Sequence, residues 1–161
     1  MIIALIPAKG NSSRLKNKNL LKINGKSLLE RAIIDCKKST LLNACYVSTD
    51  SKDIIKISKK YKVNVIKRPK KLSNKNTPIK KVIKHFINNL KRNGILPKTI
   101  VLIQPTSPYR PKKIIDKFIK EYKKNKLRSL ITTKEIKNSY FKSIIKVKDK
   151  FIIKHPNFFF S

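Results

Sequence analysis

Short apolar runs alternate along this chain with longer segments whose apolar residues recur every three or four positions. The runs are typical of buried strands, and they cover residues 2–6, 44–48, 63–66, 99–103 and 127–132. The spacing within the longer segments is that of one face of a helix. Strands that alternate with helices predict βαβ units and a mostly parallel sheet, which is an α/β fold. In such a fold the ligand site lies at the carboxyl ends of the strands.

Individual residues predict where the helices begin and end. Ser27 and Glu30 have the spacing of a capping box, which opens a helix. Thr77 is expected to be the N-cap of the most regular helix, with Pro78 in its first position and Gly94 closing it.

Two more helix starts and a hairpin follow from the same kind of reasoning. Asp50 or Ser51 is expected to cap a helix after the second apolar run, and Pro111 is expected to open one after the fourth. Residues 143–147 and 151–153 predict the two strands of a hairpin. The chain has 161 residues, a length typical of one domain, so we expect residues 1–161 to form a single domain.

The charge balance is extreme, with 41 Lys and Arg against 8 Asp and Glu and a net charge of +33. Such a field attracts nucleic acid or an anionic membrane, so a polyanion partner is one interpretation. The other is that AT-rich codon usage has enriched Lys, Asn and Ile on an otherwise neutral scaffold. We favour the second interpretation, because the lysines are scattered over every segment and arginine is scarce. Arginine is the residue that forms bidentate hydrogen bonds with bases and phosphates. Nucleic acid is therefore expected to bind only non-specifically, through charge.

Several features predict a cytoplasmic protein that does not enter a membrane. No stretch approaches the ~18 consecutive apolar residues of a membrane span. The N-terminus leads directly into a strand and lacks the cleavage site of a signal peptide. Cys36 and Cys45 lack the spacing of metal ligands, and we expect them to be free buried thiols.

The segment after the first apolar run is the strongest candidate for a binding site. Pro7 should end the strand, and Lys9, Arg14, Lys16 and Lys18 then follow with no acid among them. A loop that leaves a buried strand with free N–H groups and several cations suits a nucleoside triphosphate. It matches neither Walker A nor G-x-G-x-x-G, and a solvated basic loop is the alternative.

Residues 6–19 nevertheless resemble a known signature, I-P-A-R-x-x-S-x-R-(I/L)-x-x-K-N, of the acylneuraminate cytidylyltransferases, the CMP-sialic acid synthetase family. Further matches follow in order at residues 24–29, 47–51, 68–73 and 104–110, so that the resemblance covers residues 2 to about 135. Five ordered matches are far more specific than any one motif.

The resemblance implies a fold and a reaction. The fold is the Rossmann-like, three-layer fold of nucleotide-diphospho-sugar transferases, with a mostly parallel sheet. The reaction is transfer of CMP from CTP to a sialic-acid-like ulosonic acid, of sialic, legionaminic or pseudaminic type, with release of pyrophosphate. CTP and the sugar acid are the implied partners, and the products serve cell-surface polysaccharides.

The resemblance also assigns roles to residues. It implies catalytic contacts with the triphosphate from Lys9, Arg14 and Lys18. It implies nucleotide binding by Ala8, Gly10, Ser12, Asn19, Arg68 and Ser73. It implies contacts with the acceptor sugar from Gln104, Thr106, Ser107 and Arg110, the last of which suits a sugar-acid carboxylate.

The family's cofactor is Mg²⁺, for which Asp50 is the one candidate ligand that the residues offer, although a capping role suits it equally. The family's metal carboxylates and its dimerisation segment are not seen after Asp149, so the chain is expected to be C-terminally truncated. An apolar end at residues 158–160 would favour association, which leaves a homodimer open.

This sequence departs from the family pattern, and rival functions therefore remain. Lys9 stands where the family usually has arginine, and residues 74–76 lie in the neighbourhood where it often has an aspartate. One rival is a catalytically impaired, nucleotide-binding remnant of the same family. Another is a basic protein that binds polyanions. A 3-deoxy-manno-octulosonate cytidylyltransferase ranks lower, because its relatives carry an acid in the loop where this chain has residues 104–107.

Overall fold

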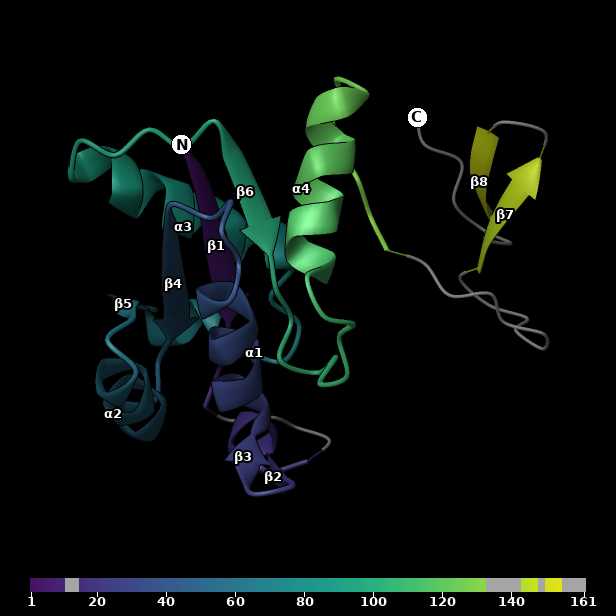
Figure 1. The fold of residues 1–161 in the computed structure, drawn as a ribbon. Helices are drawn as coiled ribbons and strands as arrows, with labels where there is room; N and C mark the ends of the chain where they lie inside the picture. The colour runs from purple at the N-terminus through teal and green to yellow at the C-terminus, as the bar shows by residue number, and fades with distance from the viewer. Residues whose placement is uncertain (11–14, 133–142, 148–149, 155–161) are drawn as a thin grey trace. The chain divides into compact units, whose positions relative to one another are not determined.

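Figure 1 shows the chain in a computed structural model, which describes residues 1–10, 15–132, 143–147 and 150–154. The chain divides into two compact units, Met1–Arg128 and Ser129–Ser161. The predicted nucleotide site falls entirely within the first unit.

A parallel sheet of four strands forms the centre of the first unit. The strands are β1 (Ile2–Pro7), β4 (Ala44–Thr49), β5 (Asn64–Lys67) and β6 (Thr99–Leu102), in the spatial order β5-β4-β1-β6. All three pairings are parallel, with Ile3 beside Ala44 on one side of β1 and beside Ile100 on the other. Four of the five predicted strands are therefore confirmed, and so is the mostly parallel α/β sheet.

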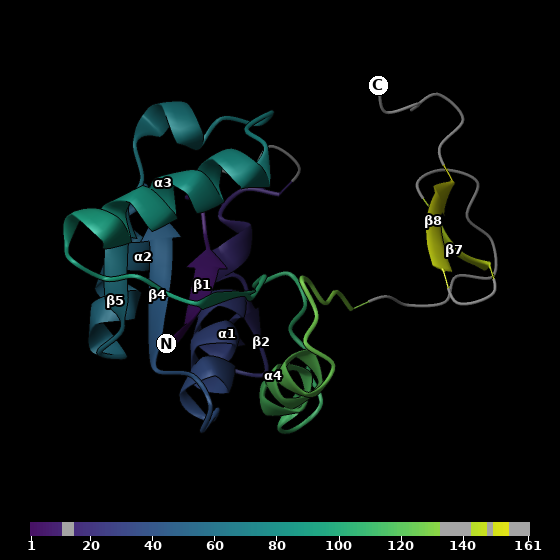
Figure 2. The same cartoon turned by 90° about the horizontal axis from the view of Figure 1, so that it is seen from above.

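Helices cover both faces of this sheet, as Figure 2 shows, with α3 on one side and α1 and α4 on the other. The bounds are Leu28–Lys37 for α1, Lys52–Lys60 for α2, Ile79–Arg92 for α3 and Ile114–Lys124 for α4. Alternate residues of β1 point to opposite faces. Ile3 and Leu5 pack with Phe86 and Leu90 of α3, while β1's other apolar residues pack with α1, α2 and α4. The result is the expected three-layer arrangement.

Local chemistry explains two of the helix ends. Ser27 and Glu30 form the predicted capping box: Glu30 N–H donates to Ser27 Oγ, and Ser27 N–H donates to the Glu30 carboxylate. At the end of α3, Ile95 N–H donates to Leu90 O and Gly94 N–H donates to Lys91 O. This pair of hydrogen bonds requires a left-handed residue at position 94. Gly94 has φ +71°, a left-handed conformation that glycine adopts without strain.

Two predicted helix starts need revision, and for a third the structure selects one of the two predicted caps. Thr77 is not an N-cap: Pro78 takes that position in extended conformation, and α3 begins at Ile79. Pro111 does not open α4 directly, because Lys113 adopts a left-handed φ of 58° and the regular helix begins after it. Ser51, and not Asp50, caps α2 by accepting from Ile54 N–H.

The predicted strand at residues 127–132 is wrong, since no strand forms there. A strand needs a neighbour to take up its N–H and C=O groups, and none of the described strands pairs with this run. Leu130 and Ile131 remain 37% and 66% exposed. The run is apolar enough for a strand, but its sequence alone does not show whether a partner lies beside it.

Short elements complete the description. Within the first unit these are the 3-10 turns η1 (Lys18–Leu20) and η2 (Lys70–Leu72) and the paired strands β2 (Lys22–Ile23) and β3 (Lys26–Ser27). In the second unit β7 (Ser143–Val147) pairs antiparallel with β8 (Lys150–Lys154), as the predicted hairpin requires. Among the described helices, none has the length and apolar character needed to cross a bilayer.

Candidate functional site

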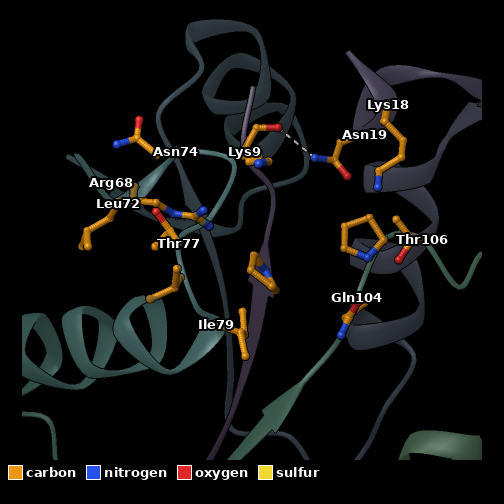
Figure 3. A pocket seen from close by; sticks show the side chains of 13 residues that line it. Lys9, Lys18, Asn19, Arg68, Leu72, Asn74, Thr77, Ile79, Gln104 and Thr106 are labelled. Atoms are coloured by element: carbon orange, nitrogen blue, oxygen red, sulfur yellow. Dashed lines mark hydrogen bonds between the residues drawn. The ribbon is translucent and has the colours of Figure 1, made fainter. Parts of the chain in front are cut away.

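The strand order places a crevice at one edge of the sheet. The connection from β1 runs to β4 on one side, whereas β6 lies on the other, so the order reverses between β1 and β6. Loops leaving two such strands diverge, and ligands bind in the gap between them. A pocket of about 250 Å³ lies at this edge (Figure 3), lined by Pro7, Lys9, Lys18, Asn19, Arg68, Leu72, Asn74, Thr77, Ile79, Val82, Gln104, Pro105 and Thr106.

Three cations meet at this pocket. Lys9 follows β1, Lys18 begins η1, and Arg68 follows β5. Among the described residues, none of the three cations has a carboxylate within salt-bridge distance. The one ion pair in the described part of the chain joins Arg110 to Asp35. Positive charges that face a pocket without an acidic partner favour a negatively charged ligand.

Arg68 is the most deeply buried of these cations, at 5% exposure. Its Nε donates to Ser48 Oγ at 3.2 Å and its Nη2 donates to Ser48 O at 2.8 Å, so β4 fixes the side chain from below. Burial lowers the pKa of Arg68, and the negative charge of Asp50 opposes that shift. A guanidinium titrates so far above neutral pH that it keeps its charge, which makes Arg68 a fixed cation at the pocket wall.

The loop after β1 is held by two side chains. Gly10 N–H donates to Asp50 Oδ1 at 2.9 Å, and Asn19 Nδ2 donates to Lys9 O at 2.9 Å. Asn19 is itself buried. These bonds keep Lys9 and Asn19 together at the pocket mouth, as Figure 3 shows.

Residue 10 must be glycine because no space is left for a side chain beside Ser51. A Cβ on this residue would lie 2.7 Å from Ser51 Cβ, closer than real Cβ atoms approach. Ser51 caps α2, so the loop passes directly against the start of that helix. The glycine that the sequence pattern assigned to phosphates thus has a packing role as well.

The opposite wall comes from the turn after β6. Gln104, Pro105 and Thr106 line the pocket, and Ser107 N–H closes the turn by donating to Gln104 O. Ser107 and Arg110 do not line it. Arg110 instead donates to Asp35 Oδ2 at 3.0 Å and to Gln104 O.

The structure therefore brings together part of the predicted site. Six of the predicted residues line the pocket: Lys9, Lys18, Asn19, Arg68, Gln104 and Thr106. Ala8 is buried beneath it, with its N–H donating to Ser48 O. Ser73 follows η2, and its buried hydroxyl has no hydrogen-bond partner among the described residues. Ser12 and Arg14 lie outside the described residues.

The sequence analysis missed the apolar side of the pocket, made by Leu72, Thr77, Ile79 and Val82. The helical spacing of Ile79 and Val82 indicated only a buried face. The signal that would have found them is position, because α3 begins immediately beyond the loop that carries Arg68.

The described residues do not make a metal site by themselves. No three His, Cys, Asp or Glu side chains among them lie close enough to share an ion. Asp50 supplies a single carboxylate, one oxygen of which already accepts from Gly10 N–H. This donor set does not fit Mg²⁺, which takes six oxygen ligands in nearly octahedral geometry.

Known proteins resemble this chain in both sequence and fold. Residues 3–153 match the family described as Cytidylyltransferase. The N-acylneuraminate cytidylyltransferase of Escherichia coli O18:K1:H7 is 32% identical over 75% of this chain and 28% of its own length. The CMP-N,N'-diacetyllegionaminic acid synthase of Legionella pneumophila is 30% identical over 68% of this chain and 47% of its own length.

Solved structures share the fold. A CMP:2-keto-3-deoxy-manno-octonic acid synthetase complexed with CTP superposes with a TM-score of 0.63 at 15% identity, over 78% of this chain and 48% of that one. A cytidylyltransferase from Leptospira borgpetersenii gives a TM-score of 0.59 at 23% identity, over 77% and 49% of the two chains. The chain thus spans about half of each solved structure, and from about a quarter to a half of the two relatives above. The family match covers both the sheet and the pocket, and the chain belongs to the cytidylyltransferase family.

Proposed function

We propose that this protein transfers CMP from CTP to a sialic-acid-like ulosonic acid and releases pyrophosphate. The observation that carries the proposal is the pocket at the edge of the sheet, where Lys9, Lys18 and Arg68 converge without a described carboxylate partner. A triphosphate supplies the negative charge that these side chains lack.

The names of the relatives support the acceptor class. Those that match across most of this chain include enzymes named for N-acylneuraminate, N,N'-diacetyllegionaminic acid and pseudaminic acid. All three acceptors are acidic sugars of one chemical class.

The chemistry asks the protein mainly for position and charge. The anomeric hydroxyl oxygen of the acid attacks the α-phosphorus of CTP and gives its proton to solvent. Pyrophosphate is displaced and leaves with the electron pair of the broken P–O bond. Lysine ammonium groups near the β- and γ-phosphates stabilise that departing charge. We assign this role to Lys9 and Lys18, together with Arg14.

The remaining residues divide between the two ends of the pocket. Arg68 and the apolar side chains Leu72 and Ile79 suit a flat base with polar edges, and Asn19 suits the nucleotide's sugar or phosphate. We assign the backbone of Ala8, Gly10 and Ser12 to the phosphates, and the unpaired hydroxyl of Ser73 to the base. Gln104 and Thr106 would face the acceptor where it meets the nucleotide, and Ser107 holds their turn through its bond to Gln104 O.

Three further properties belong to the proposal. The reaction draws on CTP, so we place it in the cytoplasm. A homodimer is proposed from the resemblance. Dependence on Mg²⁺ is expected from the resemblance alone, because Asp50 by itself does not complete the ion's ligand set among the described residues.

Pyrophosphate release tests the proposal. The chain is incubated with CTP and Mg²⁺, and N-acetylneuraminic, legionaminic or pseudaminic acid is added in separate reactions. Release with one of these acids, and none without an acceptor, is the expected result. If CTP binds but no acid triggers release, the chain is a nucleotide-binding relative without the activity.

A further inference from the structure

Arg110 is nearly buried beside the pocket and not in it. Its side chain is 11% exposed and lies in the loop between β6 and α4. One arm of the guanidinium, Nη1, donates to Asp35 Oδ2 at 3.0 Å, and the other, Nη2, donates to the backbone oxygen of Gln104. The fork thus joins helix α1 to the turn that forms one pocket wall.

The residue before it is held by the same helix. The guanidinium carbon of Arg31 lies 5.9 Å from the ring centre of Tyr109, within the range of a cation–π contact. Arg31 also donates through Nε and Nη2 to Ile23 O. Arg31 and Asp35 are one helical turn apart, so a single face of α1 holds two consecutive loop residues.

The held segment is the one that brings Gln104 and Thr106 to the pocket. Gln104 O accepts from Ser107 N–H as well as from Arg110, so the same carbonyl closes the turn and anchors it. Just before the turn, Ile103 N–H donates to Leu5 O, and Pro105 is buried. The turn is therefore fixed at both ends, by the sheet and by Arg110.

We propose that Arg110 is a positioning residue, which couples Asp35 of α1 to the Gln104 carbonyl and so holds the Gln104–Thr106 wall against the bound nucleotide. This differs from the direct contact with a substrate carboxylate that the family resemblance implies. The ligand-binding part of this inference rests on the proposed function. The coupling between Asp35 and the turn does not.

The first measurement needs no ligand. Amide exchange is followed by NMR for the full chain and for Asp35→Ala and Arg110→Ala. Exchange of the Ser107 amide should speed up by roughly tenfold in both variants, because its acceptor turn is released. The Ile103 amide, which bonds to the sheet, should not change and serves as the internal control. An unchanged Ser107 amide in Asp35→Ala overturns the inference.

The second measurement is a double-mutant cycle on CTP affinity. A positioning role predicts that Asp35→Ala and Arg110→Ala each lower the affinity for CTP by about fivefold. The double variant should have the same affinity as either single variant, because both changes break one linkage. If Arg110 contacts the ligand itself, Arg110→Ala lowers the affinity for CTP, whereas Asp35→Ala leaves that affinity unchanged or raises it. That pattern overturns the inference.

Two controls separate the alternatives. Lys112→Ala removes the same charge from an exposed position of the same loop and should change neither measurement. Arg110→Lys keeps the charge but lacks the fork, so it should release Ser107 as Arg110→Ala does. If the unaltered chain does not bind CTP, the proposed function fails, and the exchange result still decides the coupling.

Discussion

Among the single residues that line this pocket, Arg68 is a buried cation. It is buried, it is held by two hydrogen bonds to Ser48, and it has no carboxylate partner among the described residues. Burying a cation that has no carboxylate in contact, and only the more distant charge of Asp50 to offset it, is unfavourable for folding. A ligand that brings negative or polar groups to Arg68 therefore relieves a cost already present in the free protein.

We predict that Arg68→Met weakens CTP binding while leaving the fold intact. Hydrogen bonds to a charged group contribute about 1.5–3 kcal/mol, so the affinity should fall by roughly ten- to a hundredfold. The thermal midpoint should stay the same or rise, because removal of the buried charge offsets the lost bonds. Lys67→Met, at the exposed neighbouring position, is the matched control for charge. Equal affinity in the two variants would contradict this account.

His85 on α3 is expected to make the stability of the fold depend on pH. Burial lowers its pKa below the ordinary value of 6.5, and the positive charges of Arg68 and Arg92 lower it further. Its Nδ1 is buried, and no described residue forms a hydrogen bond with it. A histidine whose pKa is lowered on folding takes up its proton more readily in the unfolded chain.

Stability should therefore fall as the pH drops below about 6.5, the unfolded value, and should be insensitive to His85 above it. Urea midpoints at pH 7.5 and 5.5 measure this effect in the unaltered chain and in His85→Gln. The variant should lose less stability between the two values. A loss equal to that of the unaltered chain would show that His85 does not contribute.

At the scale of elements, the loop after β1 depends on its contact with the start of α2. Asp50 holds Gly10 from one side, and Ser51 leaves no room for a side chain on Gly10. The loop can approach the helix only because residue 10 lacks a Cβ. The same contact places Lys9 and Asn19 at the pocket.

We predict that Gly10→Ala lowers the affinity for CTP by about tenfold, because the new Cβ forces the loop away from α2. Adding Ser51→Gly removes the opposing Cβ and should restore most of the affinity. Loss of the Ser51 cap costs only a few tenths of a kcal/mol when glycine replaces it. Calorimetry on the two single variants and the double variant decides, and a double variant as weak as Gly10→Ala would contradict the packing explanation.

Sequence periodicity predicted the elements better than their ends. The four strands of the sheet were predicted because their apolar runs are short and bounded. The start of α3 was missed because the path of the preceding turn, and not the Thr77 side chain, decides it. The run at residues 127–132 failed because a strand also needs a partner.

The candidate site was predictable where it follows strand ends and unpredictable where it depends on packing. Lys9, Arg68 and Gln104 each follow a strand of a parallel sheet, so their meeting could be expected. The partner of Arg110 could not, because Asp35 lies 75 residues away on another element. Side-chain partners across such distances depend on how the helices settle on the sheet.

At the scale of the whole molecule, the net charge of +33 affects every binding measurement. Such a field attracts any triphosphate, whether or not a specific pocket exists. Salt screens this general attraction, whereas contacts within a partly buried pocket are screened much less. Specific binding and non-specific binding are therefore separated by salt and by the choice of base.

The most direct test is calorimetric titration with CTP, and with UTP, GTP and ATP for comparison, at low and at moderate salt. We predict a preference for CTP that persists at moderate salt, because Arg68 and the apolar wall distinguish the base and not only the phosphates. If all four nucleotides bind alike and salt abolishes the signal, the pocket is not a cytidine site and the central claim is wrong.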